Sequence, residues 1–121
     1  MKKLLVAEDN DSNYILMTYI LKKAYQYERA KNGLEAVEMV EKGEYDLVLM
    51  DIKMPVMNGL EATKRIKEIR PELPIIAVTA NAFDSDRQAA FDAGCDDFLS
   101  KPISSDVCLE TIARVLGEKD V

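Results

Sequence analysis

Residues 45–55 read YDLVLMDIKMP. Positions 45–50 are mostly apolar and carry large side chains, which is typical of a strand buried on both faces of a sheet. The segment runs directly into a carboxylate, Asp51, and reaches a proline at Pro55. A buried strand that ends on an acid predicts that this acid has a chemical role at the edge of a sheet.

Short apolar segments and helical patterns alternate along the whole chain. Helices are expected from 10 or 11 to about 24, at 32–43, 58–70 and 83–93, and from 104 or 105 to 116. Strands are expected between them at 2–7, 26–30, 45–50, 74–79 and 96–100. Five strands that alternate with five helices predict an α/β fold with one parallel sheet covered on both faces.

The expected helices show two further features, residues suited to their first turns and apolar stripes. Asn10 or Asp11 is expected to cap the first helix, Asn32-Gly33 opens the second, and Asn58 is expected to cap the third. The first helix carries apolar residues at helical spacing: Ile15, Leu16, Tyr19 and Ile20. A second stripe on that helix is formed by Tyr14, Met17 and Leu21. This stripe either packs in the core, as apolar stripes commonly do, or marks a face for a partner.

Composition narrows the class of protein. The chain has 121 residues, 48% hydrophobic and 31% charged, which is expected of one globular domain over 1–121. A net charge of −6 argues against direct binding of nucleic acid or an anionic membrane surface, since both need a basic patch. No apolar window has the length of a membrane span, no signal peptide is evident, and Cys95 and Cys108 suit reduced thiols. A cytoplasmic location is therefore expected.

Polar residues follow four of the five expected strands. Glu8 and Asp9 follow the first, Asp51 the third, Thr79 the fourth and Lys101 the fifth, whereas the second strand contributes nothing obvious. Because ligands bind beyond the carboxyl ends of parallel strands, these groups are expected to converge.

The three acids predict a hard divalent cation, with Mg²⁺ favoured and Mn²⁺ as an alternative. A lysine and a threonine beside them suit a phosphoryl group, and an aspartate can act as its nucleophile. The chain contains no histidine, so histidine cannot serve as base, nucleophile or metal ligand.

Four motifs together resemble the response-regulator receiver domain of two-component signalling: VAEDN at 6–10, LVLMDIKMPVMNG at 47–59, VTANA at 78–82 and FLSKP at 98–102. The resemblance implies a flavodoxin-like, doubly wound (βα)5 fold with strand order 2-1-3-4-5. It also implies a phospho-acceptor signalling domain that catalyses only its own aspartyl phosphorylation and dephosphorylation.

The resemblance assigns the chemistry residue by residue. Asp51 matches the phospho-acceptor. Glu8 and Asp9 match the acidic pair that binds Mg²⁺ together with Asp51, and the main-chain carbonyl of Lys53 matches a further ligand. Lys101 matches the lysine that pairs with the phosphoryl group.

It also implies a switch. Thr79 matches the hydroxyl that turns toward the phosphoryl group, and Phe98 occupies the aromatic position that then rotates inward. Pro102 follows a peptide bond expected to be cis. The signal is expected at the surface of the fourth helix, fifth strand and fifth helix. Lys53 and Asn81 flank the site where the family tunes phosphoryl lifetime.

The expected phosphodonor is a histidine kinase or a histidine phosphotransfer protein, and the downstream protein is not identified. The chain is either a stand-alone regulator, which its MKK start favours, or a receiver from a larger protein; VTANA and KPI resemble hybrid-kinase receivers. Three alternatives are weaker. An FMN-binding flavodoxin would place a phosphate in the acidic loop EDNDSN, and a haloacid-dehalogenase-type hydrolase would need an aspartate where Lys53 stands. A degenerate receiver would lack a functional position.

Overall fold

The computed structural model describes residues 1–80 and 84–118. Five parallel strands form one sheet in the order β2-β1-β3-β4-β5. The strands are β1 (Lys3–Ala7), β2 (Gln26–Ala30), β3 (Leu47–Asp51), β4 (Ile75–Thr79) and β5 (Asp97–Ser100). The helices are α1 (Asp11–Leu21), α2 (Gly33–Lys42), α3 (Gly59–Ile69), α4 (Asp84–Ala93) and α5 (Ser105–Val115).

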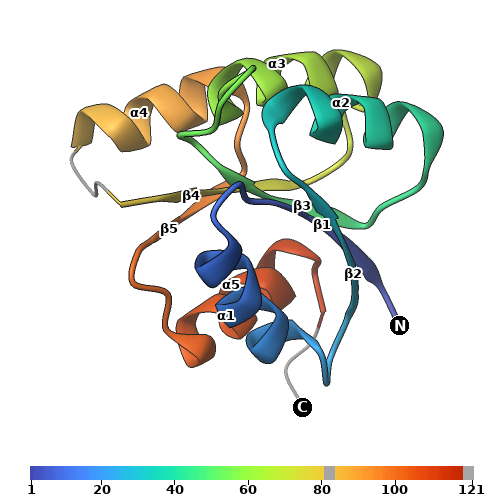
Figure 1. The fold of residues 1–121 in the computed structure, drawn as a ribbon, viewed down its shortest axis with the longest axis vertical. Coiled ribbons are helices and arrows are strands. Elements are labelled where there is room, and N and C mark those ends of the chain that lie inside the picture. Colours follow the sequence, from blue (N-terminus) through green and yellow to red (C-terminus); the bar gives the residue numbers. More distant parts are fainter. Residues whose placement is uncertain (81–83, 119–121) are drawn as a thin grey trace.

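Helices α2, α3 and α4 cover one face of the sheet, and α1 and α5 cover the other (Figure 1). This arrangement and the strand order confirm the predicted doubly wound α/β fold. Within the described ranges, no helix is both long and apolar enough to cross a membrane.

The core has one apolar layer on each face of the sheet. Leu5 and Val48 pack in the layer under α2, α3 and α4, whereas their neighbours Leu4 and Leu49 pack in the layer under α1 and α5. Successive strand residues point to opposite faces, so a strand buried on both faces must be apolar throughout. All five residues of β3, including Asp51, are buried.

Asparagines cap the first three helices: the cap expected at Asn58 is confirmed, and Asn10 rather than Asp11 caps α1. The side chains of Asn10, Asn32 and Asn58 accept hydrogen bonds from the backbone N–H three residues ahead, at 3.0, 2.8 and 2.9 Å. Each cap satisfies a donor that the first turn of a helix leaves without a partner. The helix starts were therefore readable from local chemistry.

Two boundaries, the end of α1 and the start of β3, differ from the prediction by two residues or more. Helix α1 ends at Leu21 rather than near 24. The Ala24 N–H donates to the Leu21 carbonyl three residues back (3.0 Å), a tighter turn than the α-helix, and the Tyr25 side chain that follows is buried. Strand β3 begins at Leu47 and extends to Asp51, which pairs with Val78 of β4. The expected helix start at 83 lies outside the described residues.

The two apolar stripes of α1 differ in burial. Met17 and Leu21 are buried and Tyr14 packs against the same core layer, so this stripe is ordinary core packing. The other stripe was a poor guide to the core. Of its members only Ile20 is buried; those exposed are Ile15 (52%), Leu16 (45%) and Tyr19 (65%).

Two glycines allow close backbone contacts around the loop after β3. A Cβ at Gly59 would overlap the Asp51 carbonyl oxygen, and one at Gly33 would overlap that of Met57. The loop also carries the one positive-φ residue other than glycine in the described ranges, Val56, at φ 70°. A β-branched residue in this conformation is strained. The backbone around Asp51 is therefore closely packed and tightly turned.

Candidate functional site

The carboxyl ends of four strands bring the expected polar residues to one edge of the sheet. Glu8 and Asp9 follow β1, Asp51 ends β3, Thr79 ends β4, and Lys101 follows β5. Glu8, Asp9, Asp51 and Lys101 are called the carboxyl-edge cluster below. Asp51 and Glu8 are 5% and 6% exposed although both are acids, whereas Asp9 is exposed.

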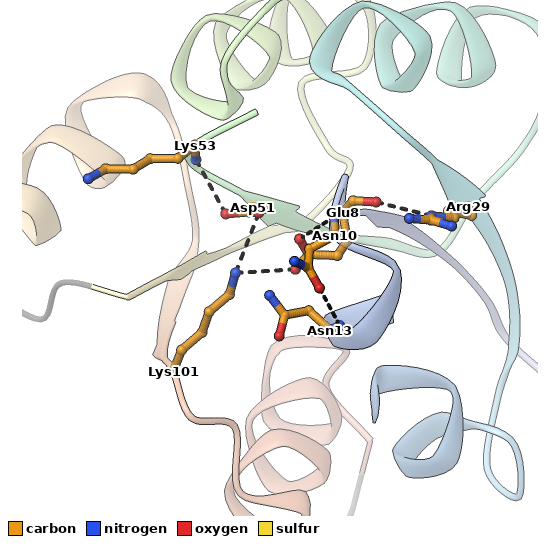
Figure 2. A network of polar contacts seen from close by, with 7 residues as sticks. All are labelled: Glu8, Asn10, Asn13, Arg29, Asp51, Lys53 and Lys101. Atoms are coloured by element: carbon orange, nitrogen blue, oxygen red, sulfur yellow. Dashed lines mark hydrogen bonds and ion pairs between the residues drawn. The ribbon is translucent and has the colours of Figure 1, made fainter. Parts of the chain in front are cut away.

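Lys101 lies between the two buried acids (Figure 2). Its Nζ is 3.5 Å from Asp51 Oδ2 and 3.3 Å from Glu8 Oε1. Asp51 Oδ1 also accepts a hydrogen bond from the Lys53 N–H, at 3.3 Å. The Lys101 N–H donates to the Thr79 carbonyl (2.8 Å), which ties the lysine to the end of β4. The contacts to the carboxylates are long for ion pairs.

One ammonium does not neutralise this cluster. The pKa of Asp51 is raised to about 7, first by burial and then by its hydrogen bond with Glu8 and the charge of Glu8, against the lowering effect of Lys101. A buried carboxylate beside a second one holds its proton because the two negative charges repel in a weakly polarisable environment. The site therefore favours an additional cation.

The donor set fits a hard divalent cation. One carboxylate oxygen each from Glu8, Asp9 and Asp51 lies within 4.8 Å of the other two. Oxygen donors from a few carboxylates, with water completing the shell, are the usual surroundings of Mg²⁺. A hollow of about 440 Å³ opens beside Asp9, Lys53 and Asn58, so the cluster is reachable from solvent.

The other expected residues lie close to this edge. Thr79 is 4% exposed. Phe98 lies in β5, partly buried, with the Arg87 guanidinium of α4 5.6 Å from the centre of its ring. The Lys101–Pro102 peptide bond is cis, as the resemblance implied. Asn81 lies outside the described residues.

Sequence reasoning missed a contribution from β2. Arg29, the penultimate residue of that strand, donates from Nε to the Glu8 carbonyl (3.0 Å), and its Nη2 is 2.9 Å from Asp11 Oδ1. In the segment QYERA an arginine looks like an ordinary solvent-facing residue of an edge strand. Only the pairing of β2 with β1 reveals that it adjoins the site.

The comparisons with known proteins agree with this geometry. The family model described as "Response regulator receiver domain" matches residues 4–113. The chain belongs to this family. It is a receiver domain of two-component signal transduction, and its family is not one of enzymes that turn over a separate substrate.

Two curated relatives of this receiver domain differ in kind. It is 40% identical to the polar-differentiation response regulator DivK of Brucella anthropi, over 97% of this chain and 98% of that protein. It is 41% identical to hybrid signal transduction histidine kinase B of Dictyostelium discoideum, again over 97% of this chain. In that case the receiver domain spans only 7% of the relative's length.

Solved receiver domains have the same fold. The receiver domain of a sensor histidine kinase from Pseudomonas aeruginosa, with magnesium coordinated in its active site cleft, superposes with a TM-score of 0.90 at 33% identity. That match covers 97% of this chain and 98% of the other. A Saccharomyces cerevisiae receiver domain, crystallised with a histidine phosphotransfer signalling protein, gives 0.88 at 31% identity, over 94% and 88% of the two chains.

Proposed function

We propose that the chain accepts a phosphoryl group on Asp51 from a phosphohistidine. The observation that carries the proposal is the buried Asp51 carboxylate at the tip of β3, faced by Lys101 and Glu8. A carboxylate oxygen of Asp51 forms a bond to phosphorus as the phosphorus–nitrogen bond of the donor breaks. The electron pair of that bond stays on the imidazole, and the product is an aspartyl phosphate.

Four groups of the chain would hold the cation: the carboxylates of Glu8, Asp9 and Asp51, and the main-chain carbonyl of Lys53. Bound Mg²⁺, or Mn²⁺ in its place, supplies positive charge that offsets the negative charge of the carboxylates and the incoming phosphoryl oxygens. Lys101 pairs with a phosphoryl oxygen from the side of β5. Strand β3 holds Asp51 in a fixed position, which favours in-line attack because phosphoryl transfer depends on positioning.

The phosphoryl group would then change one surface. Thr79 donates a hydrogen bond to a phosphoryl oxygen, and Phe98 turns into the space that Thr79 leaves. This repacks the surface of α4, β5 and α5, where a downstream protein reads the state. The exposed side chains Phe91 of α4 and Val107 of α5 support a role of this surface in binding a protein.

The donor would be a histidine kinase or a histidine phosphotransfer protein. The similarity to a receiver domain crystallised with a phosphotransfer protein supports this class of partner. In this proposal residues 1–121 act as one receiver domain and catalyse only the gain and loss of their own phosphoryl group. The cytoplasmic location expected from the sequence stays a prediction.

The test is the intact mass of the protein after incubation with acetyl phosphate, with and without Mg²⁺, beside Asp51→Asn. We expect a gain of one phosphoryl group that requires both Mg²⁺ and Asp51. If the wild type gains no mass, formation of the beryllofluoride complex is measured next, because it reports the same site without depending on phosphoryl lifetime. Failure to form either adduct would contradict the proposal.

A further inference from the structure

Arg29 makes three contacts, one with the loop between β1 and α1 and two with the first turn of α1. Its Nε donates to the Glu8 carbonyl (3.0 Å), its Nη2 is 2.9 Å from Asp11 Oδ1, and its guanidinium lies 4.5 Å from the centre of the Tyr14 ring. Among the described residues Nη2 has no hydrogen-bond partner, so its contact with Asp11 is an ion pair. The side chain is only 16% exposed.

These contacts enclose the segment that carries two of the three acids of the metal donor set. The Glu8 carbonyl is held by a hydrogen bond, and the ion pair with Asp11, whose side chain is 82% exposed, adds a weaker contact on the other side of Asp9. In Figure 2, Arg29 reaches Glu8 from the side away from Asp51 and Lys101. The Glu8 carboxylate and carbonyl are therefore held from different sides.

Two further hydrogen bonds hold the loop, one to β2 and one to the Glu8 side chain. The Glu8 N–H donates to the Ala30 carbonyl (3.0 Å), and the Asn10 N–H donates to Glu8 Oε2 (3.2 Å). Arg29 adds a link that these two bonds do not make, from β2 to the first turn of α1. A cation such as Mg²⁺ requires near-ideal octahedral geometry, so donors on a looser loop bind it less well.

We propose that Arg29 is a positioning residue that holds the segment 8–11 in the geometry that binds the divalent cation. This inference rests on the proposed function, because it concerns the cation of the same site. Residues that orient metal ligands typically contribute 10- to 100-fold to metal affinity. Lysine cannot replace arginine here, because it has no planar fork to donate to a carbonyl while pairing with a carboxylate.

If Arg29 acted only through its charge, its removal would change the Mg²⁺ affinity in the opposite direction. Arg29 is a cation beside a cation site, so its removal would tighten Mg²⁺ binding if it acted only through its field. Positioning predicts weaker binding. Two variants separate these effects. Arg29→Gln removes both the charge and the planar guanidinium, whereas Arg29→Lys keeps the charge and removes the planar guanidinium.

The experiment measures the dissociation constant of Mg²⁺ alone for the unphosphorylated protein by calorimetric titration, with folding checked by circular dichroism. We expect both Arg29 variants to bind Mg²⁺ about tenfold more weakly than the wild type. The matched control Arg65→Gln, at an exposed position of α3, is expected to bind like the wild type. The phosphorylation rate of Arg29→Lys should recover at saturating Mg²⁺, since the acceptor and Lys101 are intact.

Unchanged affinity in Arg29→Lys with tighter binding by Arg29→Gln would overturn the inference and leave a field effect only. Unchanged affinity in both variants would also overturn it. If one variant does not fold, the other still tests the inference, because positioning predicts weaker Mg²⁺ binding in each variant. Absence of Mg²⁺ binding by the wild type would instead contradict the proposed function, so the two failures are distinguishable.

Discussion

Lys67 and Lys101 lie at opposite edges of the same sheet, and each faces a carboxylate from a neighbouring element. At the amino edge, Lys67 Nζ is 2.9 Å from Asp96 Oδ2 and 2.7 Å from the Leu73 carbonyl. The same carboxylate oxygen accepts the Ile75 N–H at 2.8 Å. Lys67, Asp96 and these two backbone groups are called the amino-edge cluster. It has one positive charge, one negative charge and short contacts.

The carboxyl-edge cluster has the reverse properties. One ammonium faces two buried acids at 3.3 and 3.5 Å, with a third acid beside them, and the pKa of Asp51 is raised to about 7. The amino-edge cluster joins elements and stabilises them, whereas the carboxyl-edge cluster holds a surplus of negative charge that is relieved by a proton on Asp51 or by a further cation. Surplus charge, more than the presence of an ion pair, distinguishes a reactive site from a structural one.

The largest expected effect is on the free energy of unfolding, and it tests the surplus of negative charge in the carboxyl-edge cluster. Without Mg²⁺, Asp51→Asn should raise the free energy of unfolding at pH 8 by as much as about 4 kcal/mol. The raised pKa means that folded protein holds the Asp51 proton up to about pH 7, whereas unfolded protein loses it near 3.8. Wild-type stability therefore falls as pH rises through this window, and the variant lacks that loss. Urea unfolding from pH 4 to pH 8 measures the difference.

The matched variant at the amino edge is Asp96→Asn, which should lower the free energy of unfolding by about 1 kcal/mol because it removes a satisfied ion pair. Mg²⁺ should stabilise the wild type at pH 8 and have little effect on Asp51→Asn. Equal pH dependence of the wild type and Asp51→Asn would contradict the comparison of the two edges.

A second prediction concerns the backbone at each edge. Gly59→Ala should lower the free energy of unfolding by about 3 kcal/mol, because the new Cβ would overlap the carbonyl oxygen of Asp51. Gly94→Ala should cost about 1–2 kcal/mol. Its Cβ would meet the flexible Lys67 side chain at 3.1 Å, and its φ of 115° disfavours alanine.

Urea unfolding gives both values, and the phosphorylation rate gives a second readout. Gly59→Ala should also slow phosphorylation, since the shift displaces Asp51, whereas Gly94→Ala should leave the rate unchanged. A Gly59→Ala protein as stable and as active as the wild type would show that the loop after β3 adapts easily. The tight packing around the acceptor would then be without consequence.

The third prediction compares the removal of each of the two lysines. Lys101→Ala should slow phosphorylation by acetyl phosphate about 100-fold, as loss of a preorganised charge at a reaction centre typically does. Lys67→Ala should keep the rate within about twofold and lower the free energy of unfolding by about 1–2 kcal/mol. Time-resolved intact mass and urea unfolding provide the two measurements. Similar rates in the two variants would remove the distinction between the edges.

Much of the molecule could be predicted from local patterns. The segment LVLM is apolar at every position, as a strand buried on both faces requires, and Asn10, Asn32 and Asn58 stood at the helix starts. The convergence of Glu8, Asp51 and Lys101 followed from the alternation of strands and helices, because parallel strands all end at one edge.

Other features depended on packing between distant segments. On α1 the sequence offers two apolar stripes, and the sheet buries the one with Met17 and Leu21 while Ile15 and Tyr19 stay exposed. The end of α1 moved to Leu21 because Tyr25 enters the core. Hydrophobic spacing alone cannot rank two adjacent stripes, since it contains no information on which face meets the sheet.

By itself the sequence determined the alternation of elements, the acid at the tip of β3 and the set of polar residues at one edge. These follow from residue types within a few positions of one another. The tertiary structure alone decided the raised pKa of Asp51, the position of Lys101 between two acids and the contact of Arg29 with Glu8. Each depends on residues that are 21 or more positions apart in the sequence. Burial and distance set electrostatic energies, and both exist only once the chain has folded.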